Sequence, residues 1–185
     1  MRRMFVLIIV MLILATMFSA CNNQPDTILA PTFDNALVNY GGSDEFYLGA
    51  LNSDKLSVDS VQHLPIYKFE SLAELNQFKT TFANDFSFEQ THGEFKSFEM
   101  VVNEIDEDFF NMYSLLLIYV PCNSSSLRYE VEKTVVSNGA DVCIYIQQTK
   151  NPEEVTNDMA GWFVFCTFFG LQEGGYASYD AKMME

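Results

Sequence analysis

Two apolar runs in the second half of the chain restrict its fold more than any other feature. Residues Leu115 to Val120 are continuously apolar up to Pro121, and Trp162 to Phe169 form a second apolar stretch. A strand with one face in water alternates polar and apolar residues, whereas a strand buried on both faces does not. The first run therefore predicts a central strand buried on both faces, and the second predicts another apolar strand.

The clearest predicted helix begins at Ser71. Glu74 follows three residues later, which is the capping-box pattern of a helix start. Apolar residues then recur at steps of three and four residues as far as Phe82, with polar residues between them. This pattern is typical of an amphipathic helix that covers a sheet.

Helical spacing of apolar residues recurs after Ser97 and continues to Phe109. The second half of this segment is acidic, and acidic side chains are unfavourable near the negative C-terminal end of a helix. We therefore expect the helix to break near Asp106, with Asp108 as the cap of a short turn that ends at Asn111.

The last third of the chain has the signals of a β-hairpin. The turn Ser137 to Ala140 is centred on Asn-Gly and separates the alternating segments 127–136 and 142–146. Helices early in the chain and hairpin strands late, without regular alternation, are typical of an α+β fold. We predict a mostly antiparallel β-sheet with two helices packed on one face, and a weak strand or frayed end after Tyr176.

The predicted domain follows a polar segment. Residues 21–44 carry many polar residues with Pro and Gly, which is typical of a flexible tether. Alternating residues at 46–51 indicate a short strand near the start of the domain. We therefore divide the chain into a leader at 1–20, a tether at 21–44 and a single domain at 45–185.

The first twenty residues have the parts of a secretory signal peptide. Arg2 and Arg3 provide a positive start, and Met4 to Leu14 form an unbroken apolar run. Small residues then precede Cys21. The apolar run is shorter than the roughly 20 residues of a membrane-spanning helix, so we expect residues 1–20 to be removed on export.

The placement of Cys21 resembles the lipobox of bacterial lipoproteins, in which small residues precede a cysteine. The resemblance implies cleavage just before Cys21 and acylation of its thiol, with palmitate as a representative acyl chain. It also implies a lipid-anchored protein of the cell envelope, on the extracytoplasmic face of the membrane. Since two acyl chains give stable anchoring, the predicted partner of Cys21 is the lipid bilayer.

The net charge of the chain limits the classes of partner that it is expected to bind. The formal net charge is −15, and loss of Arg2 and Arg3 with the leader makes it more negative. Nucleic acids and anionic leaflets attract clusters of Lys and Arg. We therefore expect no nucleic-acid partner and no electrostatic docking on an anionic bilayer, while the acidity helps to keep an exported domain soluble.

Three cysteines remain in the predicted domain. They are Cys122, Cys143 and Cys166. One disulfide with a spare thiol is compatible with an oxidising compartment, whereas their apolar neighbours favour reduced, buried cysteines. His63 and His92 lie far from them in the sequence, so the spacing does not support a zinc site.

No segment of the sequence carries a motif that is specific for one type of chemical reaction. The acidic residues at 104–108 lack the glycine and the spacing of a calcium loop. Ser124 to Ser126 lack the elbow motif of serine hydrolases, and His63 and His92 each stand alone in the sequence. We predict no catalytic residue, no metal ligand and no cofactor.

Two loops are candidates for binding a partner. One is the polar loop Cys122–Ser126, and the other is the segment 151–161, which leads into a strand that begins with the single Trp. The candidate partner-binding residues are Ser124, Ser125, Asp158 and Trp162. A Trp at the edge of a domain can anchor an interface. The alternative is that Trp162 closes the core while Asp158 caps the loop backbone.

The stretch from Ser114 to Phe169 resembles the C-terminal domain of PrcB-type protease-complex subunits. The matching features are an apolar strand after Asp108-Phe109-Phe110, the polar loop Asn123–Ser126, Arg128-Tyr129, the Asn-Gly hairpin, Gln147-Gln148-Thr149 before Asn151-Pro152, and Asp158-Met159-Ala160. The resemblance implies a non-catalytic accessory domain near envelope proteases, and it carries over no catalytic residue.

These features lead to one main hypothesis and two alternatives. The main hypothesis is a membrane-anchored extracytoplasmic lipoprotein that acts as a non-catalytic binding or accessory module, with an envelope protein as its partner. The first alternative is a cell-surface hydrolase that uses paired carboxylates such as Glu153, Glu154 and Asp158 on either side of a cleft. The second is a purely structural envelope protein.

Overall fold

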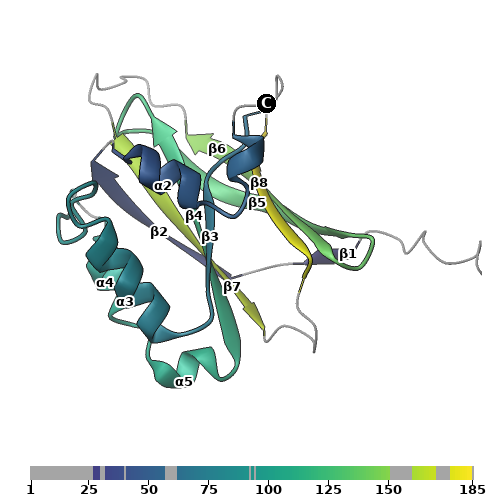
Figure 1. The fold of residues 1–185 in the computed structure, drawn as a ribbon. Helices are drawn as coiled ribbons and strands as arrows, with labels where there is room; N and C mark the ends of the chain where they lie inside the picture. Colours follow the sequence, from purple (N-terminus) through teal and green to yellow (C-terminus); the bar gives the residue numbers. More distant parts are fainter. Residues whose placement is uncertain are drawn as a thin grey trace, which may run out of the picture.

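The computed structural model describes residues 27–29, 32–39, 41–56, 62–91, 93, 95–150, 160–169 and 176–184. Within these residues the chain forms eight strands, four α-helices and one 3-10 helix (Figure 1). In chain order they are β1 (Thr27–Leu29), β2 (Thr32–Asn39), α2 (Asp44–Gly49), η1 (Ser53–Lys55), β3 (Ile66–Phe69), α3 (Leu72–Thr81), α4 (Phe98–Val102), α5 (Glu107–Phe110), β4 (Tyr113–Cys122), β5 (Arg128–Ser137), β6 (Asp141–Lys150), β7 (Ala160–Phe169) and β8 (Ser178–Met183).

The strands form two four-stranded sheets instead of the single sheet expected from the sequence. One sheet has the order β2-β7-β4-β3 and is antiparallel throughout. The other has the order β1-β5-β6-β8, and in it β8 runs parallel to β6 while the other pairs are antiparallel. The mixed content of helices and mostly antiparallel strands agrees with the α+β prediction.

The first hydrophobic core contains residues of both sheets. Two sheets form because each buries its apolar face against the other. β4 and β7 contribute alternate residues, and β5, β6 and β8 contribute their inward-facing residues. The buried members are Leu64, Ile66, Leu116, Ile118, Val120, Cys122, Leu127, Tyr129, Val136, Val142, Ile144, Ile146, Ala160, Trp162, Val164, Cys166, Phe168 and Ala181. The remaining residues of the run Leu115–Val120 are also buried, so the prediction of a strand buried on both faces is confirmed.

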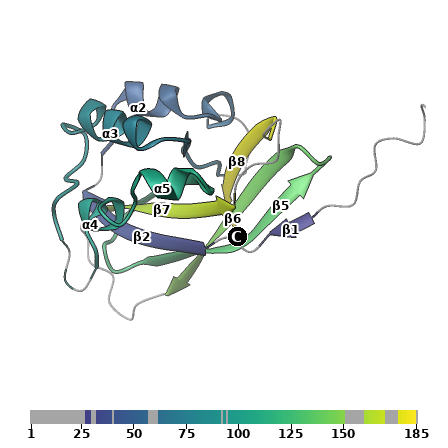
Figure 2. The ribbon, with the colours of Figure 1, turned by 90° about the horizontal axis from the view of Figure 1, so that it is seen from below.

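The second core is rich in aromatic residues. It combines the other alternate residues of β4 and β7 with side chains from the helical segments, and Figure 2 shows the helices grouped around β2 and β7, away from β1 and β5. Its buried members are Ala36, Val38, Phe46, Phe69, Leu75, Phe78, Phe82, Phe86, Phe88, Phe98, Val101, Val102, Leu115, Leu117, Tyr119, Phe163 and Phe165. Many of the seventeen Phe residues of the chain are used in this cluster.

Two local predictions are confirmed in detail. The hydroxyl of Ser71 accepts a hydrogen bond from the backbone N–H of Glu74 at 3.2 Å, so Ser71 is the N-cap of α3. In the turn between β5 and β6, Asn138 and Gly139 have φ angles of 54° and 69°. Positive φ at both central residues is the requirement of a type I′ hairpin turn, and Asn-Gly meets it.

The predicted helix at 97–109 breaks, as expected, into α4 and α5. The cap of the second piece is Asp106 rather than Asp108, because the Asp106 carboxylate accepts from the backbone N–H of Phe109 at 2.9 Å. Glu107 and Asp108 then lie in the first turn of α5, where the positive end of the helix dipole favours acidic side chains.

The segment 46–51 is not the predicted strand, because residues 46–49 belong to the helix α2. The Ser43 hydroxyl accepts from the backbone N–H of Phe46 at 3.3 Å and so caps α2, with two acidic residues in the first turn. Phe46 is buried, whereas Leu48 is 75% exposed. The alternating apolar pattern was therefore misleading, because only one of these two apolar side chains faces the core.

The prediction of a tether over 21–44 is wrong for 27–29 and 32–39, which are strands. β2 pairs with β7 along eight residues, and β1 pairs with β5. Ala36 and Val38 are fully buried, and β2 lies at the edge of its sheet, beside β7. After Tyr176, where the sequence predicts a weak strand or a frayed end, the structure has the strand β8, which is paired with β6.

Gly161 allows the close approach of β7 to the ring of Tyr119. A Cβ at Gly161 would overlap that ring, which is fully buried and whose hydroxyl accepts from the backbone N–H of Gly41 at 3.2 Å. We expect Gly161→Ala to lower the free energy of unfolding by about 1–3 kcal/mol, as overpacking of a core does. Urea denaturation measures this change, and an unchanged midpoint would contradict the packing of Tyr119.

Candidate functional site

The loop that follows β4 begins beside the start of β7. Cys122, the last residue of β4, pairs with Ala160, the first residue of β7. The loop 123–127 therefore lies at the end of the sheet where β7 begins, directly after the second predicted loop in the sequence. Asp158 of that second loop lies outside the described residues, as does Cys21.

Arg128 links the first loop to Trp162. Its Nη1 donates to the carbonyl oxygens of Ser125 at 2.8 Å and Leu127 at 2.7 Å. The guanidinium carbon lies 4.0 Å from the ring centre of Phe95 and 5.3 Å from that of Trp162. Cation–π contacts of this kind contribute roughly 0.5–2 kcal/mol, so the loop backbone is held by an arginine that is itself stacked on aromatic rings.

The structure brings three of the four candidate partner-binding residues into this region. Ser124 is fully buried, and its Oγ lies 2.7 Å from that of Ser126. Trp162 is 1% exposed, in agreement with the alternative that it closes the core, so it offers no area to a partner. Ser125 is half-buried and Asn123 is exposed. Binding of a partner at this end stays a prediction.

Sequence reasoning did not assign Arg128 or Phe95 to this region. The only local signal was an arginine directly after the loop of hydroxyl residues, at the first position of a strand. Phe95 is more than thirty positions away from Arg128 in the chain, and no periodic pattern connects the two.

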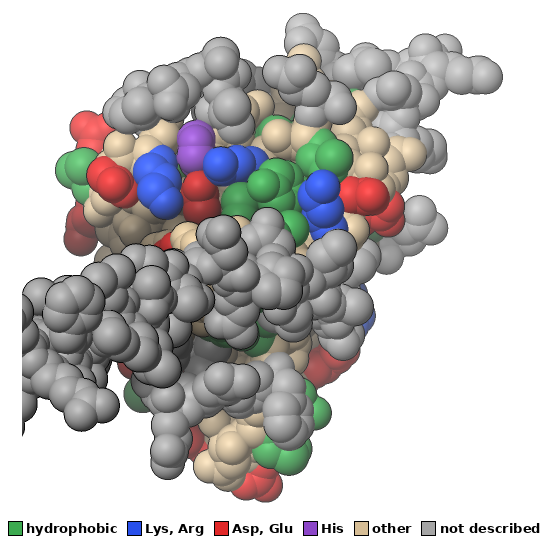
Figure 3. All heavy atoms as spheres, turned by 90° about the vertical axis from the view of Figure 1, so that its right-hand side faces the viewer, with side chains coloured by type: hydrophobic (Ala, Val, Ile, Leu, Met, Phe, Trp, Pro, Cys, Tyr) green, Lys and Arg blue, Asp and Glu red, His purple; other side chains and the backbone are tan. Residues whose placement is uncertain are grey.

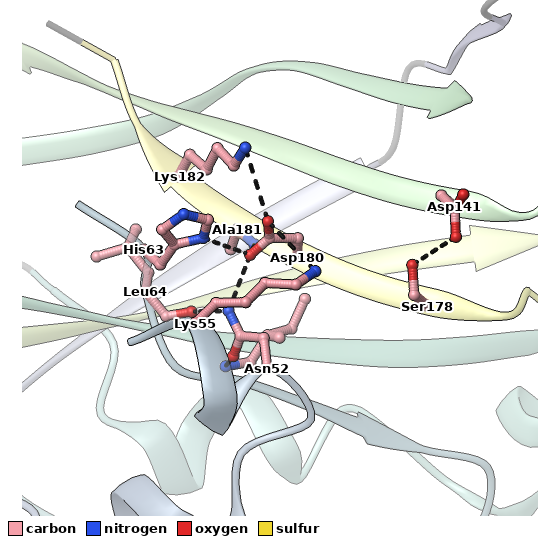
Figure 4. Close-up of polar contacts among 10 residues, drawn as sticks. Asn52, Lys55, His63, Leu64, Asp141, Ser178, Asp180, Ala181 and Lys182 are labelled. Carbon is pink, nitrogen blue, oxygen red and sulfur yellow. Dashed lines mark hydrogen bonds and ion pairs between the residues drawn. The ribbon is translucent and has the colours of Figure 1, made fainter. Parts of the chain in front are cut away.

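A second polar cluster centres on Asp180 of β8 (Figure 4). This side chain belongs to a residue that is 7% exposed. Its Oδ1 lies 2.9 Å from Nδ1 of His63 and accepts from Nδ2 of Asn52 at 3.0 Å. Its Oδ2 lies 3.7 Å from Nζ of Lys55 and 3.8 Å from Nζ of Lys182. Because an ionised carboxylate only accepts, Nδ1 of His63 carries the shared proton.

The surroundings of Asp180 hold its pKa below the ordinary value. Burial of the carboxyl group raises the pKa, but the hydrogen bonds from His63 and Asn52 and the positive charge of Lys55 lower it by more. The ionised form is therefore the stable form of Asp180 in the folded protein at neutral pH.

The cluster joins Asn52 and residues 63–66 to β8. Nδ2 of Asn52 also donates to the carbonyl oxygen of Leu64 at 2.9 Å, and Oδ1 of Asn52 accepts from the backbone N–H of Ile66 at 3.3 Å. The backbone N–H of Leu64 in turn donates to the carbonyl oxygen of Ala181 at 2.8 Å. The acceptor atoms of Asp180 are thus used to join two distant parts of the chain.

The outer face of the sheet β1-β5-β6-β8 carries this cluster. Figure 3 shows basic side chains and an acidic one beside the histidine, next to an apolar strip. A carboxylate that holds Nδ1 of a histidine orients the ring so that Nε2 can act as a general base. However, Cys143, which pairs with Asp180 across β6 and β8, has a thiol pKa that burial raises. An activated cysteine needs a lowered pKa, so the geometry favours a structural role.

The three cysteines of the described domain are free thiols. Cys122 and Cys166 are buried and Cys143 is half-buried, in keeping with the preferred interpretation of buried cysteines. Burial raises the pKa of Cys166 to about 12, so its thiol stays protonated at neutral pH.

Metal binding finds no support in the described part of the chain. There, no group of three or more His, Cys, Asp and Glu side chains is arranged to hold a metal ion. Glu104 of the proposed acidic cluster pairs with Lys96 at 3.0 Å, and Asp106 caps α5. His92 lies outside the described residues. Within the same ranges, no helix is both long and apolar enough to cross a membrane.

Comparison of this chain with known protein families, with curated proteins and with solved structures finds no match. Its function is therefore argued from the sequence and from the geometry of these two regions.

Proposed function

We propose that this chain is a lipid-anchored extracytoplasmic protein whose folded domain is a non-catalytic binding or accessory module. The observation that carries the proposal is the leader 1–20, with its positive start and apolar run, followed directly by Cys21. Acyl chains on Cys21 hold an acidic domain at the membrane surface.

The proposed partner surface is the end at which β4 finishes and β7 begins. The exposed Asn123 and the half-buried Ser125 lie there, and Arg128 fixes the loop backbone through two hydrogen bonds. The resemblance of 114–169 to PrcB-type subunits points to an envelope protease as the partner. A photo-crosslinking amino acid at Asn123 tests this, with the same group at Gln77 on α3 as the control. Recovery of the same envelope protein from both positions, or of none, contradicts the proposal.

We also infer that α2, α3 and α4 form one layer on the face of the sheet β2-β7-β4-β3 that carries Leu117 and Phe163. The shared cluster of aromatic residues supports this arrangement, since Phe46, Phe78 and Phe98 come from these three helices. The other face of the same sheet is then covered by the second sheet.

The hydrolase alternative has one observation in its favour, the contact between His63 and Asp180. The carboxylates proposed for it from the sequence, Glu153, Glu154 and Asp158, lie outside the described residues. Because Asp180 also accepts from Asn52 and lies near two lysines, we favour its role in joining β8 to Asn52 and His63. A purely structural envelope protein is distinguished by the crosslinking experiment, since it would give no defined partner at Asn123.

Replacement of Cys21 by Ser should abolish membrane association. Wild-type protein expressed in a bacterium with lipoprotein-processing enzymes should incorporate labelled palmitate and sediment with membranes, because the thioether-linked chains are its anchor. Cys21→Ser should incorporate no label, and the matched variant Cys143→Ser should behave as the wild type. Unlabelled wild-type protein free in the culture fluid would overturn the proposed anchor.

A further inference from the structure

An open hollow of about 710 Å³ lies between the end of α3, the segment 83–90 and the start of α4. We call it the α3–α4 hollow. Natural small-molecule sites have volumes of about 300–1,000 Å³, so its size is adequate for a ligand. Its lining residues are Lys79, Thr80, Ala83, Phe86, Ser87, Phe88, Glu89, Gln90 and Glu99. It shares no residue with the loop 123–127 or with the Asp180 cluster.

The walls of the hollow are fixed by the aromatic core. The segment 83–90 forms no helix or strand, but Phe86 and Phe88 are 3% and 7% exposed and pack in the second core. The backbone N–H of Glu99 donates to the carbonyl oxygen of Phe88 at 2.9 Å and so joins α4 to this segment. A ligand therefore meets a preformed site, and binding to a preformed site costs less conformational entropy.

An ion pair between α3 and α4 forms part of the lining. Figure 1 shows these helices side by side, and Nζ of Lys79 donates to Oε1 of Glu99 at 2.9 Å. The two side chains are 22% and 32% exposed. An ammonium group has three protons to donate, and within the described part of the chain Glu99 is the hydrogen-bond partner of this one. Its other protons are available to water or to a ligand in the hollow.

The remaining polar residues add both donors and acceptors. The Thr80 hydroxyl donates to the carbonyl oxygen of Asn76 at 2.9 Å, so it offers an acceptor to the hollow. The exposed side-chain amide of Gln90 offers both a donor and an acceptor, and the exposed carboxylate of Glu89 accepts. The exposed Ala83 contributes an apolar contact beside these groups.

The charge and the hydrogen-bonding groups of the lining select a class of ligand. Lys79 and Glu99 balance each other, which leaves the negative charge of Glu89. Together with the net charge of −15 for the chain, this disfavours a phosphate or another anion. A hydroxyl group donates and accepts through one oxygen atom, and a sugar ring combines such groups with apolar C–H faces. A neutral sugar therefore matches the mixed lining.

We propose that the α3–α4 hollow binds a neutral oligosaccharide. Because the hollow is open, a sugar chain can continue beyond it in the solvent. This inference adds a second kind of ligand to the protein partner proposed for the loop 123–127. It depends neither on that partner nor on acylation of Cys21, so the experiments on those proposals and the experiment below succeed or fail separately.

A nuclear magnetic resonance titration tests the site residue by residue. The chain from residue 21 onward, with Cys21→Ser, is labelled with nitrogen-15 and titrated with chitotetraose, a neutral chain of N-acetylglucosamine units. Parallel titrations use inorganic phosphate as an anionic probe and the dipeptide alanyl-alanine as a zwitterionic probe. The resonances of the backbone amides show where each probe binds.

Chitotetraose should shift the amide resonances of residues 79–90 and 99 in a saturable way. Gln90→Ala should weaken this binding by about threefold to tenfold, as the loss of one hydrogen bond does. Gln77→Ala is the matched control, because Gln77 is also exposed but lies on α3 outside the hollow. It should bind chitotetraose as the wild type does.

The ion pair provides a second, independent variant. Lys79→Met should also weaken binding, because it removes the ammonium protons. Lys96→Met is its control, since Lys96 pairs with Glu104 at 3.0 Å away from the hollow. The absence of saturable shifts at 79–90, or equal effects of a variant and its control, overturns the inference. Saturation of the same amides by phosphate or alanyl-alanine at lower concentration overturns the assignment to a neutral sugar.

Discussion

Replacing Phe46 with alanine should lower the free energy of unfolding by about 3–5 kcal/mol, as expected for the loss of a buried phenyl ring. Phe46 is fully buried, and its ring lies 4.9–6.4 Å, between centroids, from seven other aromatic rings. These belong to Tyr47, Tyr67, Phe78, Phe82, Phe86, Tyr119 and Phe163. Since a domain of this kind has a stability of about 5–15 kcal/mol, such a loss leaves it marginal.

The neighbouring Leu48 is the matched control for Phe46. Both residues lie in α2, but Leu48 is 75% exposed, so Leu48→Ala should change the stability by no more than about 0.5 kcal/mol. Urea denaturation followed by circular dichroism measures both variants. Equal, small effects would show that the aromatic core does not depend on α2.

Replacing Asp180 with alanine should lower the free energy of unfolding by about 3 kcal/mol at pH 7. The main cause is that the donors around this buried carboxylate would be left without their acceptor. His63 and Asn52 would lose their acceptor and, with it, their side-chain contact with β8. The exposed Asp54 of η1 provides the control, because Asp54→Ala breaks no buried contact. Denaturation midpoints of the two variants should therefore differ clearly.

The effect of Asp180 should depend on pH in the acid range. Its folded-state pKa is lowered, so its contribution is fully present above the unfolded-state pKa of about 3.9 and is lost as the pH falls through the folded-state pKa. The stability difference between wild type and Asp180→Ala should shrink below about pH 4. Asp180→Asn keeps an acceptor for His63 or Asn52 without the titration. A difference between wild type and Asp180→Ala that stays constant down to pH 3 would contradict the assignment.

Features that depend on neighbouring residues were predictable from the sequence. The Ser71 cap, the Asn138-Gly139 turn and the break before α5 each follow from residues within a few positions of one another. The apolar run Leu115–Val120 also predicted a buried strand, because burial on both faces removes the need for alternation.

The errors came from segments whose structure depends on distant partners. Residues 32–39 form the strand β2 because they pair with β7, and residues 27–29 form β1 because they pair with β5. The helix α2 has a local signal in its Ser43 cap, but the core position of Phe46 depends on distant aromatic residues, which an alternating apolar pattern does not reveal.

The candidate sites were predicted only in part, for the same reason. The loop Cys122–Ser126 was identified from its composition, but its attachment to Phe95 and Trp162 through Arg128 required the folded chain. His63 and Asp180 are separated by 117 positions, and each is an ordinary residue in its own segment.

The amino-acid sequence alone determined the Ser71-capped helix, the hairpin turn and the double-sided burial of β4, and it predicts the leader and the lipid anchor at Cys21. Each of these depends on short-range hydrogen bonding, on backbone φ preference or on the apolar character of consecutive residues. Only the tertiary structure decided that two sheets enclose the first core, that Trp162 is buried, and that Asp180 meets His63 and Asn52. Those outcomes depend on which strands become neighbours, and strand pairing is set by burial across the whole domain rather than by any local pattern.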